Sequence, residues 1–201
     1  MIGSLPLLRL NMTEEVKVID NFLPEEQFKE LAGFLLPTSE NAPDFPWFYR
    51  HGKASHGDGS FQFSHLFFEM HDSVLSSNYY AIVQPLLFKI SNRNDITGGC
   101  LFKRIKANLE TIKKKRESDF HWDYYNKEEN PKPEKNMRIG IFYINTNNGY
   151  TELEDGTKVD SIANRILLFP NTIKHRGVSQ TDEGLRCVIN INYFKEEYNT
   201  K

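Results

Sequence analysis

The short stretch DFHWDYYN, residues 119–126, contains side chains that can bind a metal ion. His121 and Asp123 stand two positions apart, with Trp122 between them. If this segment is a strand, the alternation of side chains places His121 and Asp123 on one side and Trp122 on the other. Two potential metal ligands then converge, and the rest of the chain must supply a third.

A third ligand is available in the segment RILLFPNTIKHRGVSQTDEGLRCVININYF. His175 follows the apolar run that ends at Pro170. Two histidines and one carboxylate occupy one face of a metal ion and leave the opposite face open, as in non-haem Fe(II) oxygenases. The sequence therefore predicts a metal site formed by His121, Asp123 and His175.

Arg186 begins the next predicted strand, RCVININ. An arginine at the start of an inward-facing row needs a partner, and its planar guanidinium is shaped to hold a carboxylate through two parallel hydrogen bonds. Asn190 shares this face and would be a costly inward group without a cofactor, water or substrate contact. Alternation places Arg186, Val188 and Asn190 on one face of the strand and Cys187, Ile189 and Ile191 on the other.

The carboxy-terminal half has the pattern of an antiparallel β structure, which could position these residues. From Leu101 onward, turn-forming residues separate short β-branched or aromatic runs: LFKRIKANLETI, MRIGIFYINT, NRILLFP and RCVININ. Asn148–Gly149 predicts a tight turn.

The amino-terminal half predicts a short strand and two helices. After an apolar strand at 16–19, Pro24 suits the first position of a helix, and the acidic residues that follow it suit the helix dipole. A second helix is predicted to begin near Pro85. The first helix ends before Pro37 and carries the apolar stripe Phe28, Leu31 and Leu35.

The overall composition predicts one globular domain. The chain has 201 residues, 39% of them hydrophobic and 13% aromatic, which excludes a disordered or fibrous class. A net charge of −2 argues against a broad nucleic-acid-binding surface. The basic run 113–116 is then either a solvated turn or a local nucleic-acid patch, and the first is favoured. No stretch approaches the roughly 20 apolar residues of a membrane span.

The two cysteines, Cys100 and Cys187, are too few for a disulfide framework and lack the spacing of a metal finger. Cys187 is expected in the core. The opening MIGSLPLLRLN has no basic leader and no small-residue cleavage site. These features predict a cytoplasmic protein with ordinary reduced thiols.

The order of these motifs resembles that of the 2-oxoglutarate and Fe(II)-dependent oxygenases. The resemblance rests on His121-x-Asp123, then GIFYINTNNGYTELEDG, NRILLFP, His175 and Arg186. It is closest to the prolyl 4-hydroxylase-like branch, in the short form carried by bacteriophages, which would place the protein in the host cytoplasm. It extends over most of the chain through the earlier stretches VIDNFLPEEQFKEL, FPWFY and GSFQFSHLFFE.

The resemblance implies a mainly β (α+β) fold, a double-stranded β-helix (a cupin-like jelly roll) with N-terminal helices packed on the outside. Residues 1–201 would form one oxygenase domain, with 1–100 as a helix-containing support and 101–201 as the β-helix core. His121, Asp123 and His175 match the iron triad, and Arg186 matches the residue that pairs with the distal carboxylate of 2-oxoglutarate. The prolyl hydroxylases usually have lysine at this last position, so cofactor binding carries over better than substrate choice does.

The resemblance also implies a reaction. Fe(II), the co-substrate 2-oxoglutarate and O2, with ascorbate as a reductant, would hydroxylate a substrate C–H bond and release succinate and CO2. Peptidyl proline is the first substrate candidate, and a small metabolite or free amino acid is the second. A metal-bearing jelly roll that binds a partner without turnover is the alternative outside enzymology, and the oligomeric state stays open.

Further residues have two readings each. Tyr143 and Asn108 either hydrogen-bond the cofactor or are ordinary strand residues. A second His-x-Asp pair, His56 and Asp58, lies in a glycine-rich and serine-rich stretch that predicts a loop and not a metal site. The segment 124–136 lacks strand periodicity and is expected to be a mobile rim over the site or a solvated connector. Packing or surface positions are predicted for His65 and His71.

Overall fold

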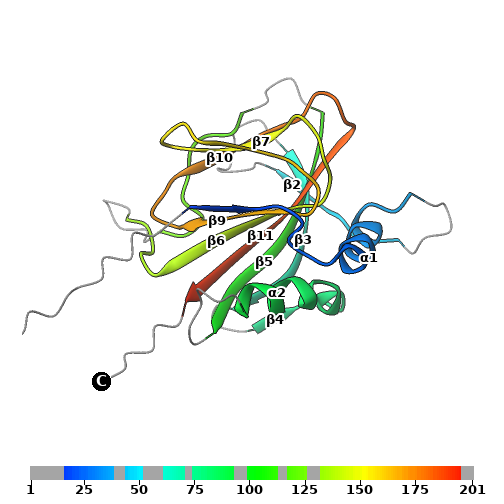
Figure 1. Cartoon of the computed structure of the whole chain (residues 1–201), viewed down its shortest axis with the longest axis horizontal. Helices are drawn as coiled ribbons and strands as arrows, with labels where there is room; N and C mark the ends of the chain where they lie inside the picture. Colours follow the sequence, from blue (N-terminus) through cyan, green and yellow to red (C-terminus); the bar gives the residue numbers. More distant parts are fainter. Residues whose placement is uncertain are drawn as a thin grey trace, which may run out of the picture.

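The computed structural model describes residues 16–38, 44–51, 61–70, 74–92, 99–112, 117–125 and 132–195. Their strands form two antiparallel sheets, and the predicted jelly roll is confirmed (Figure 1). The small sheet has the order β10 (His175–Val178), β7 (Tyr150–Leu153), β8 (Lys158–Asp160). The large sheet has the order β1 (Lys17–Ile19), β9 (Arg165–Pro170), β6 (Met137–Tyr143), β11 (Leu185–Lys195), β5 (Cys100–Thr111), β3 (Phe61–Met70), β2 (Phe48–His51), and β4 (Val74–Ser76) also pairs with β3.

Strand β11 lies in the middle of the large sheet and pairs with β6 on one side and β5 on the other. Its β-branched residues suit a strand that is covered on both faces. Arg186 pairs with Glu110 of β5, and Asn190 pairs with Lys106. Near its beginning, β5 carries one extra residue, Lys103, because Asn192 pairs with Arg104 while Tyr193 pairs with Phe102. This bulge shifts the alternation of β5.

The two faces of the large sheet are covered by different elements. Helices α1 (Glu25–Leu35) and α2 (Gln84–Ser91), with the 3-10 turn η1 (Tyr80–Val83), cover one face and enclose the larger apolar core. The small sheet covers the other face, where a smaller core includes Ile141, Leu153 and Val188. Figure 1 shows α2 and the strands β7 and β10 on opposite sides of the large sheet.

The predicted helices form nearly where they were expected. Pro24 is the N-cap of α1 and not its first helical residue, and Leu31 and Leu35 are buried as predicted. Phe28 packs edge-on against Phe142 of β6, with 6.1 Å between ring centroids. Pro85 lies in the first turn of α2. Within the described ranges, no helix has the length and apolar character needed to cross a membrane.

Two local patterns gave a different structure. The strand considered for the segment around His121 does not form, because His121 makes one isolated bridge with His175 and Asp123 lies in a bend. The tight turn predicted at Asn148–Gly149 is wrong: Asn148 lies in a bend, between β6 of the large sheet and β7 of the small one. The connection 144–149 therefore carries the chain from one sheet to the other. In both cases a long-range contact overrides the local pattern.

Candidate active site

Two segments that are distant in sequence bring the predicted metal ligands together. The backbone N–H of His121 donates to the carbonyl of His175, and that of His175 donates to His121, each at 3.0 Å. This pairing holds the imidazoles side by side, with 4.6 Å between ring centroids. The ligand atoms of His121, Asp123 and His175 lie within 4.8 Å of one another, so the three residues could hold a metal ion.

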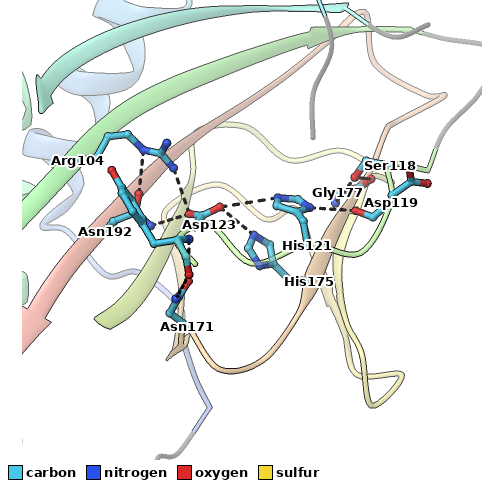
Figure 2. Close-up of polar contacts among 10 residues, drawn as sticks. Arg104, Ser118, Asp119, His121, Asp123, Asn171, His175, Gly177 and Asn192 are labelled. Atoms are coloured by element: carbon cyan, nitrogen blue, oxygen red, sulfur yellow. Dashed lines mark hydrogen bonds and ion pairs between the residues drawn. The ribbon is translucent and has the colours of Figure 1, made fainter. Parts of the chain in front are cut away.

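The carboxylate of Asp123 lies between the histidines and a polar pair from the large sheet (Figure 2). Its Oδ1 is 3.8 Å from Nε2 of His121 and 3.7 Å from Nε2 of His175. Its Oδ2 accepts a hydrogen bond from Asn192 at 2.6 Å and lies 3.6 Å from the Arg104 guanidinium. Arg104 in turn donates to Oδ1 of Asn192 at 3.1 Å. One carboxylate oxygen is thereby held, and the other faces the imidazoles.

The protonation states suit metal binding. Burial alone would raise the pKa of the Asp123 carboxyl, but the two histidines, the Arg104 guanidinium and the Asn192 amide hold it well below its usual range. Burial lowers the pKa of His175 to about 4, so its imidazole is neutral at pH 7. Nδ1 of His121 lies 3.0 Å from the carbonyl of Asp119 and must donate there, which leaves the lone pair on Nε2.

The chain beyond Asp123 is tied to the turn that follows β9. The side chain of Asn171 donates to the carbonyls of Tyr124, at 2.7 Å, and Glu134, at 3.2 Å. The indole of Trp122 donates to the carbonyl of Thr172 at 3.0 Å. These bonds hold both ends of the predicted rim 124–136, of which residues 126–131 lie outside the described part of the chain.

A cavity of about 230 Å³ adjoins the three ligands. One wall is the face of β5 and β11 that looks toward the small sheet, so the alternation predicted for β11 is observed. Arg186, Val188 and Asn190 line the cavity, whereas Cys187, Ile189 and Ile191 belong to the helix-covered core. From β5 and β3 come Arg104, Lys106, Asn108, Glu110 and Gln62.

Arg186 is buried in the wall of this cavity, at 3% exposure. Its Nε has no hydrogen-bond partner among the described residues. The side chain passes close to Gly149, where an added Cβ would lie 2.8 Å from Cδ of Arg186 and 2.9 Å from the carbonyl of Val178. No other residue type fits at this glycine without displacing the arginine. Across the strand pair, Glu110 accepts a hydrogen bond from Ser179 at 2.6 Å.

The other predicted cofactor residues occupy different positions. Asn108 and Asn190 both line the cavity, and Oδ1 of Asn108 is buried without a hydrogen-bond partner in the described part of the chain. Tyr143 is fully buried beneath the wall, and its hydroxyl donates to Thr151 at 2.8 Å. Burial raises the pKa of Tyr143 to about 12, so the phenol stays neutral. Thr151, which accepts this hydrogen bond, lines the cavity.

The remaining histidine predictions divide in two. His65 packs in an aromatic cluster, and its ring nitrogens lie 2.8 Å from the carbonyl of Pro46 and 2.8 Å from the hydroxyl of Ser77. It is a packing residue, as expected. His56, Asp58, His71 and the basic run 113–116 lie outside the described residues.

Sequence reasoning missed Arg104, Lys106, Asn171 and Asn192. Asn192 continues the alternation of Arg186, Val188 and Asn190 by one further step, so this pattern could have found it. Lys106 follows from the same alternation on β5, two positions before Asn108. No local signal indicates Asn171, because its role depends on the return of residues 117–125 to the end of β9.

Comparison with known proteins agrees with this geometry at the level of the fold. No protein-family model matches the sequence, and no curated protein does. Among solved structures, the chain is similar to an oxidoreductase of the 2OG-Fe(II) oxygenase family from Burkholderia pseudomallei, with a TM-score of 0.65 and 8% identity over 90% of this chain and 86% of that one.

Two prolyl hydroxylases are also similar. The first, from Trichoplax adhaerens, is in complex with a hypoxia inducible factor peptide fragment and gives a TM-score of 0.57 and 18% identity over 91% of this chain and 84% of that one. The second is a viral collagen prolyl hydroxylase from Paramecium Bursaria Chlorella virus-1, in a 2OG complex, with a TM-score of 0.54 and 11% identity over 90% of this chain and 96% of that one. The chain therefore has the fold of the 2OG-Fe(II) oxygenases.

Proposed function

We propose that this protein is a 2-oxoglutarate- and Fe(II)-dependent oxygenase that hydroxylates a C–H bond, with peptidyl proline as the first substrate class to test. One observation carries the proposal: a single cavity is lined both by the ligand set His121, Asp123 and His175 and by the buried, incompletely paired guanidinium of Arg186. A metal-binding module without turnover has no need for the second feature.

The three ligands would hold Fe(II) on one face and leave the cavity side open. Iron bound there with 2-oxoglutarate supplies the activation of O2 and the oxidative decarboxylation that yields succinate and CO2. Asp123 enters this role already ionised, and His175 already neutral, so neither residue must lose a proton to bind the metal at pH 7.

Arg186 would bind the distal carboxylate of 2-oxoglutarate. Its guanidinium is buried and can donate two parallel hydrogen bonds, which fixes the co-substrate in one orientation relative to the metal. Gly149 provides the space that this side chain occupies. Asn108 and Asn190 line the same cavity, and the amide oxygen of Asn108 still lacks a partner within the described ranges, so both are proposed as further polar contacts. Tyr143 would act through Thr151.

The cavity limits what can react. Its volume of about 230 Å³ is below the roughly 300–1,000 Å³ of pockets that enclose a drug-sized ligand. It can therefore admit the co-substrate and the reacting end of a substrate, while the rest of the substrate stays outside. A proline in a peptide satisfies this condition, and the peptide bound to the similar hydroxylase from Trichoplax adhaerens supports testing it first. A free amino acid or small metabolite also satisfies it.

The decisive experiment is an assay of coupled turnover. The protein is incubated with Fe(II), 2-oxoglutarate, ascorbate and O2 together with proline-containing peptides or small molecules. Succinate formation is measured, and mass spectrometry detects a gain of one oxygen atom. If the metal-loaded protein forms no succinate at any concentration of 2-oxoglutarate, the proposed activity is contradicted. A binding module without turnover would then be the better interpretation.

Replacement of Arg186 tests the co-substrate assignment. Arg186→Ala should raise the dissociation constant for 2-oxoglutarate by roughly ten- to a hundredfold, because a charge-assisted pair contributes on the order of 1.5–3 kcal/mol. Mn(II) affinity should change little. Arg176→Ala is the matched control, since that guanidinium is already paired with Glu152 and Glu117. Equal 2-oxoglutarate affinity in the two variants would contradict the assignment.

The cytoplasmic location expected from the sequence is part of this proposal. Both Cys100 and Cys187 are free thiols, which is compatible with a reducing compartment.

A further inference from the structure

Lys106 is a cation in the cavity wall that the proposed reaction does not use. It lies on β5 between Arg104 and Asn108, and its cross-strand neighbour is Asn190. No hydrogen bond or ion pair joins its ammonium group to another residue in the described parts of the chain. Lys106 is half-buried, and its side chain lines the cavity. A cation that is partly removed from water and has no protein partner favours binding of an anion.

The charges around Lys106 place it at the metal end of the cavity. The ionised groups that act on it are Arg104, Asp123, Arg50 and Glu69, and Arg186 is not among them. Burial, followed by the charge of Arg104, lowers the pKa of Lys106 to about 8. The amine is therefore still mostly protonated at pH 7 and can act as a cation.

The neighbours of Lys106 already have partners. Arg104 contacts Asp123 and Asn192, and Nε of Arg50 donates to Ser64 at 3.3 Å. Glu69 accepts a hydrogen bond from the hydroxyl of Tyr124 at 3.5 Å. With Lys106, three cations face two carboxylates at this end of the cavity, so positive charge is in excess even before a metal ion binds Asp123. An anion that enters the cavity would reduce this excess.

We infer that Lys106 binds a carboxylate of the substrate, so that the C–H bond to be hydroxylated belongs to a molecule with a negative charge close to the reacting carbon. This inference rests on the proposed function. Two sources share this chemistry: the α-carboxylate of a free amino acid or small acid, and an acidic side chain beside the target residue of a peptide. A neutral peptide would leave the lysine unpaired.

The co-substrate is a poorer partner for Lys106. In the register of β11 and β5, Arg186 lies opposite Glu110 and Asn190 lies opposite Lys106. The two cations are thus four positions apart, which is about 13 Å along a strand. If Arg186 holds one carboxylate of the co-substrate and the metal holds the other, both carboxylates already have a cationic partner. The charge of Lys106 then remains for a second anion.

Matched probe pairs test this inference in binding. The protein is loaded with Mn(II) and 2-oxoglutarate, which permits no turnover, and titrated by calorimetry. The free-acid pair is N-acetyl-L-proline and its neutral amide. The peptide pair is N-acetyl-prolyl-aspartate amide and N-acetyl-prolyl-asparagine amide. The variants are Lys106→Met, which removes the charge, Lys106→Arg, which keeps it, and Lys103→Met, a control at the bulge of the same strand that does not line the cavity.

We expect the charged member of at least one pair to bind wild-type protein at least tenfold more tightly than its neutral partner. Lys106→Met should remove this preference without changing the affinity for Mn(II) or 2-oxoglutarate, Lys106→Arg should retain most of it, and Lys103→Met should retain all of it. The pair that shows the preference identifies the source of the carboxylate.

Other outcomes overturn the inference. These are equal binding within both pairs, no binding by either charged probe, or a preference that survives Lys106→Met. If Lys106→Met weakens 2-oxoglutarate instead, the lysine serves the co-substrate, and the inference fails while the proposed function stands. If wild-type protein binds neither Mn(II) nor 2-oxoglutarate, the proposed function itself fails.

Discussion

A buried histidine lies on each side of the large sheet, and the two differ in how many hydrogen-bond partners their ring nitrogens have. His65, on the helix-covered face, is 3% exposed, and both of its ring nitrogens lie within hydrogen-bond distance of a protein oxygen. His175, on the cavity side, is also 3% exposed, but its Nδ1 has no partner among the described residues and its Nε2 faces Asp123 across 3.7 Å. The two histidines are therefore equally buried, but only His65 has a hydrogen-bond partner for each ring nitrogen among the described residues.

The same contrast extends to the surroundings of each face. The helix-covered face is an apolar core in which aromatic rings meet, as Phe45 and Phe67 do around His65. The cavity face carries Arg186, Asn108 and Lys106, which hold unused hydrogen-bonding capacity or unpaired charge in the described chain. Unsatisfied polar groups cost stability unless a ligand pairs with them. The helix-covered face is thus suited to stabilising the fold, and the cavity face is suited to the ligand binding proposed above.

The largest expected effect comes from replacing each of the two histidines in turn. His175→Ala should lower Mn(II) affinity at least a hundredfold and abolish succinate formation, because one of three ligands is lost. His65→Ala should destabilise the protein but leave Mn(II) affinity unchanged once it is folded. Metal titration and thermal unfolding of both variants provide the comparison. Equal metal affinity in the two variants would break it.

The next effect comes from Ile191, which lies in the helix-covered core at 0% exposure. Ile191→Ala should reduce the free energy of unfolding by about 2–5 kcal/mol, the usual effect of truncating a buried isoleucine. Chemical denaturation measures this change. Metal and 2-oxoglutarate affinity, measured where the variant is folded, should match the wild type. A variant of normal stability but weakened metal binding would show that the two faces do not divide the work as described.

The smallest effect comes from Asn192, the next residue on the same strand, whose side chain points to the opposite face. Asn192→Ala removes the donor that holds Oδ2 of Asp123 and the acceptor of the Arg104 bond. Loss of a group that orients a ligand typically costs about 10–100-fold in metal affinity, and we expect the lower end of that range because Arg104 remains. Asn192→Leu, which keeps the approximate size but removes both the donor and the acceptor, should behave alike. Normal metal affinity in both variants would make Asn192 a packing residue.

The candidate functional residues were largely predictable from the sequence, whereas the contacts that position them were not. The candidate triad and the place of Arg186 in the cavity wall follow from residue types, spacing and alternation, and these depend on local geometry. The alternation argument assumed a strand at His121, but a single bridge to His175 positions this residue instead. The contacts that hold Asp123 depend on Arg104, which faces the cavity although Phe102, two positions earlier, packs in the helix-covered core. The bulge at Lys103 causes this change of face, and no local sequence pattern predicts an extra residue in the strand.

The reciprocal backbone bonds between His121 and His175 have a consequence for how the metal is acquired and exchanged. They join two residues from distant parts of the chain into one candidate bidentate unit. The entropy of closing the intervening loop is lost when the protein folds, so it does not reduce the affinity of the folded protein for the ion. If the site binds a metal as proposed, the protein should fold before it binds the ion. The cavity adjoins all three candidate ligands, so replacement of one ion by another should not require the two sheets to separate.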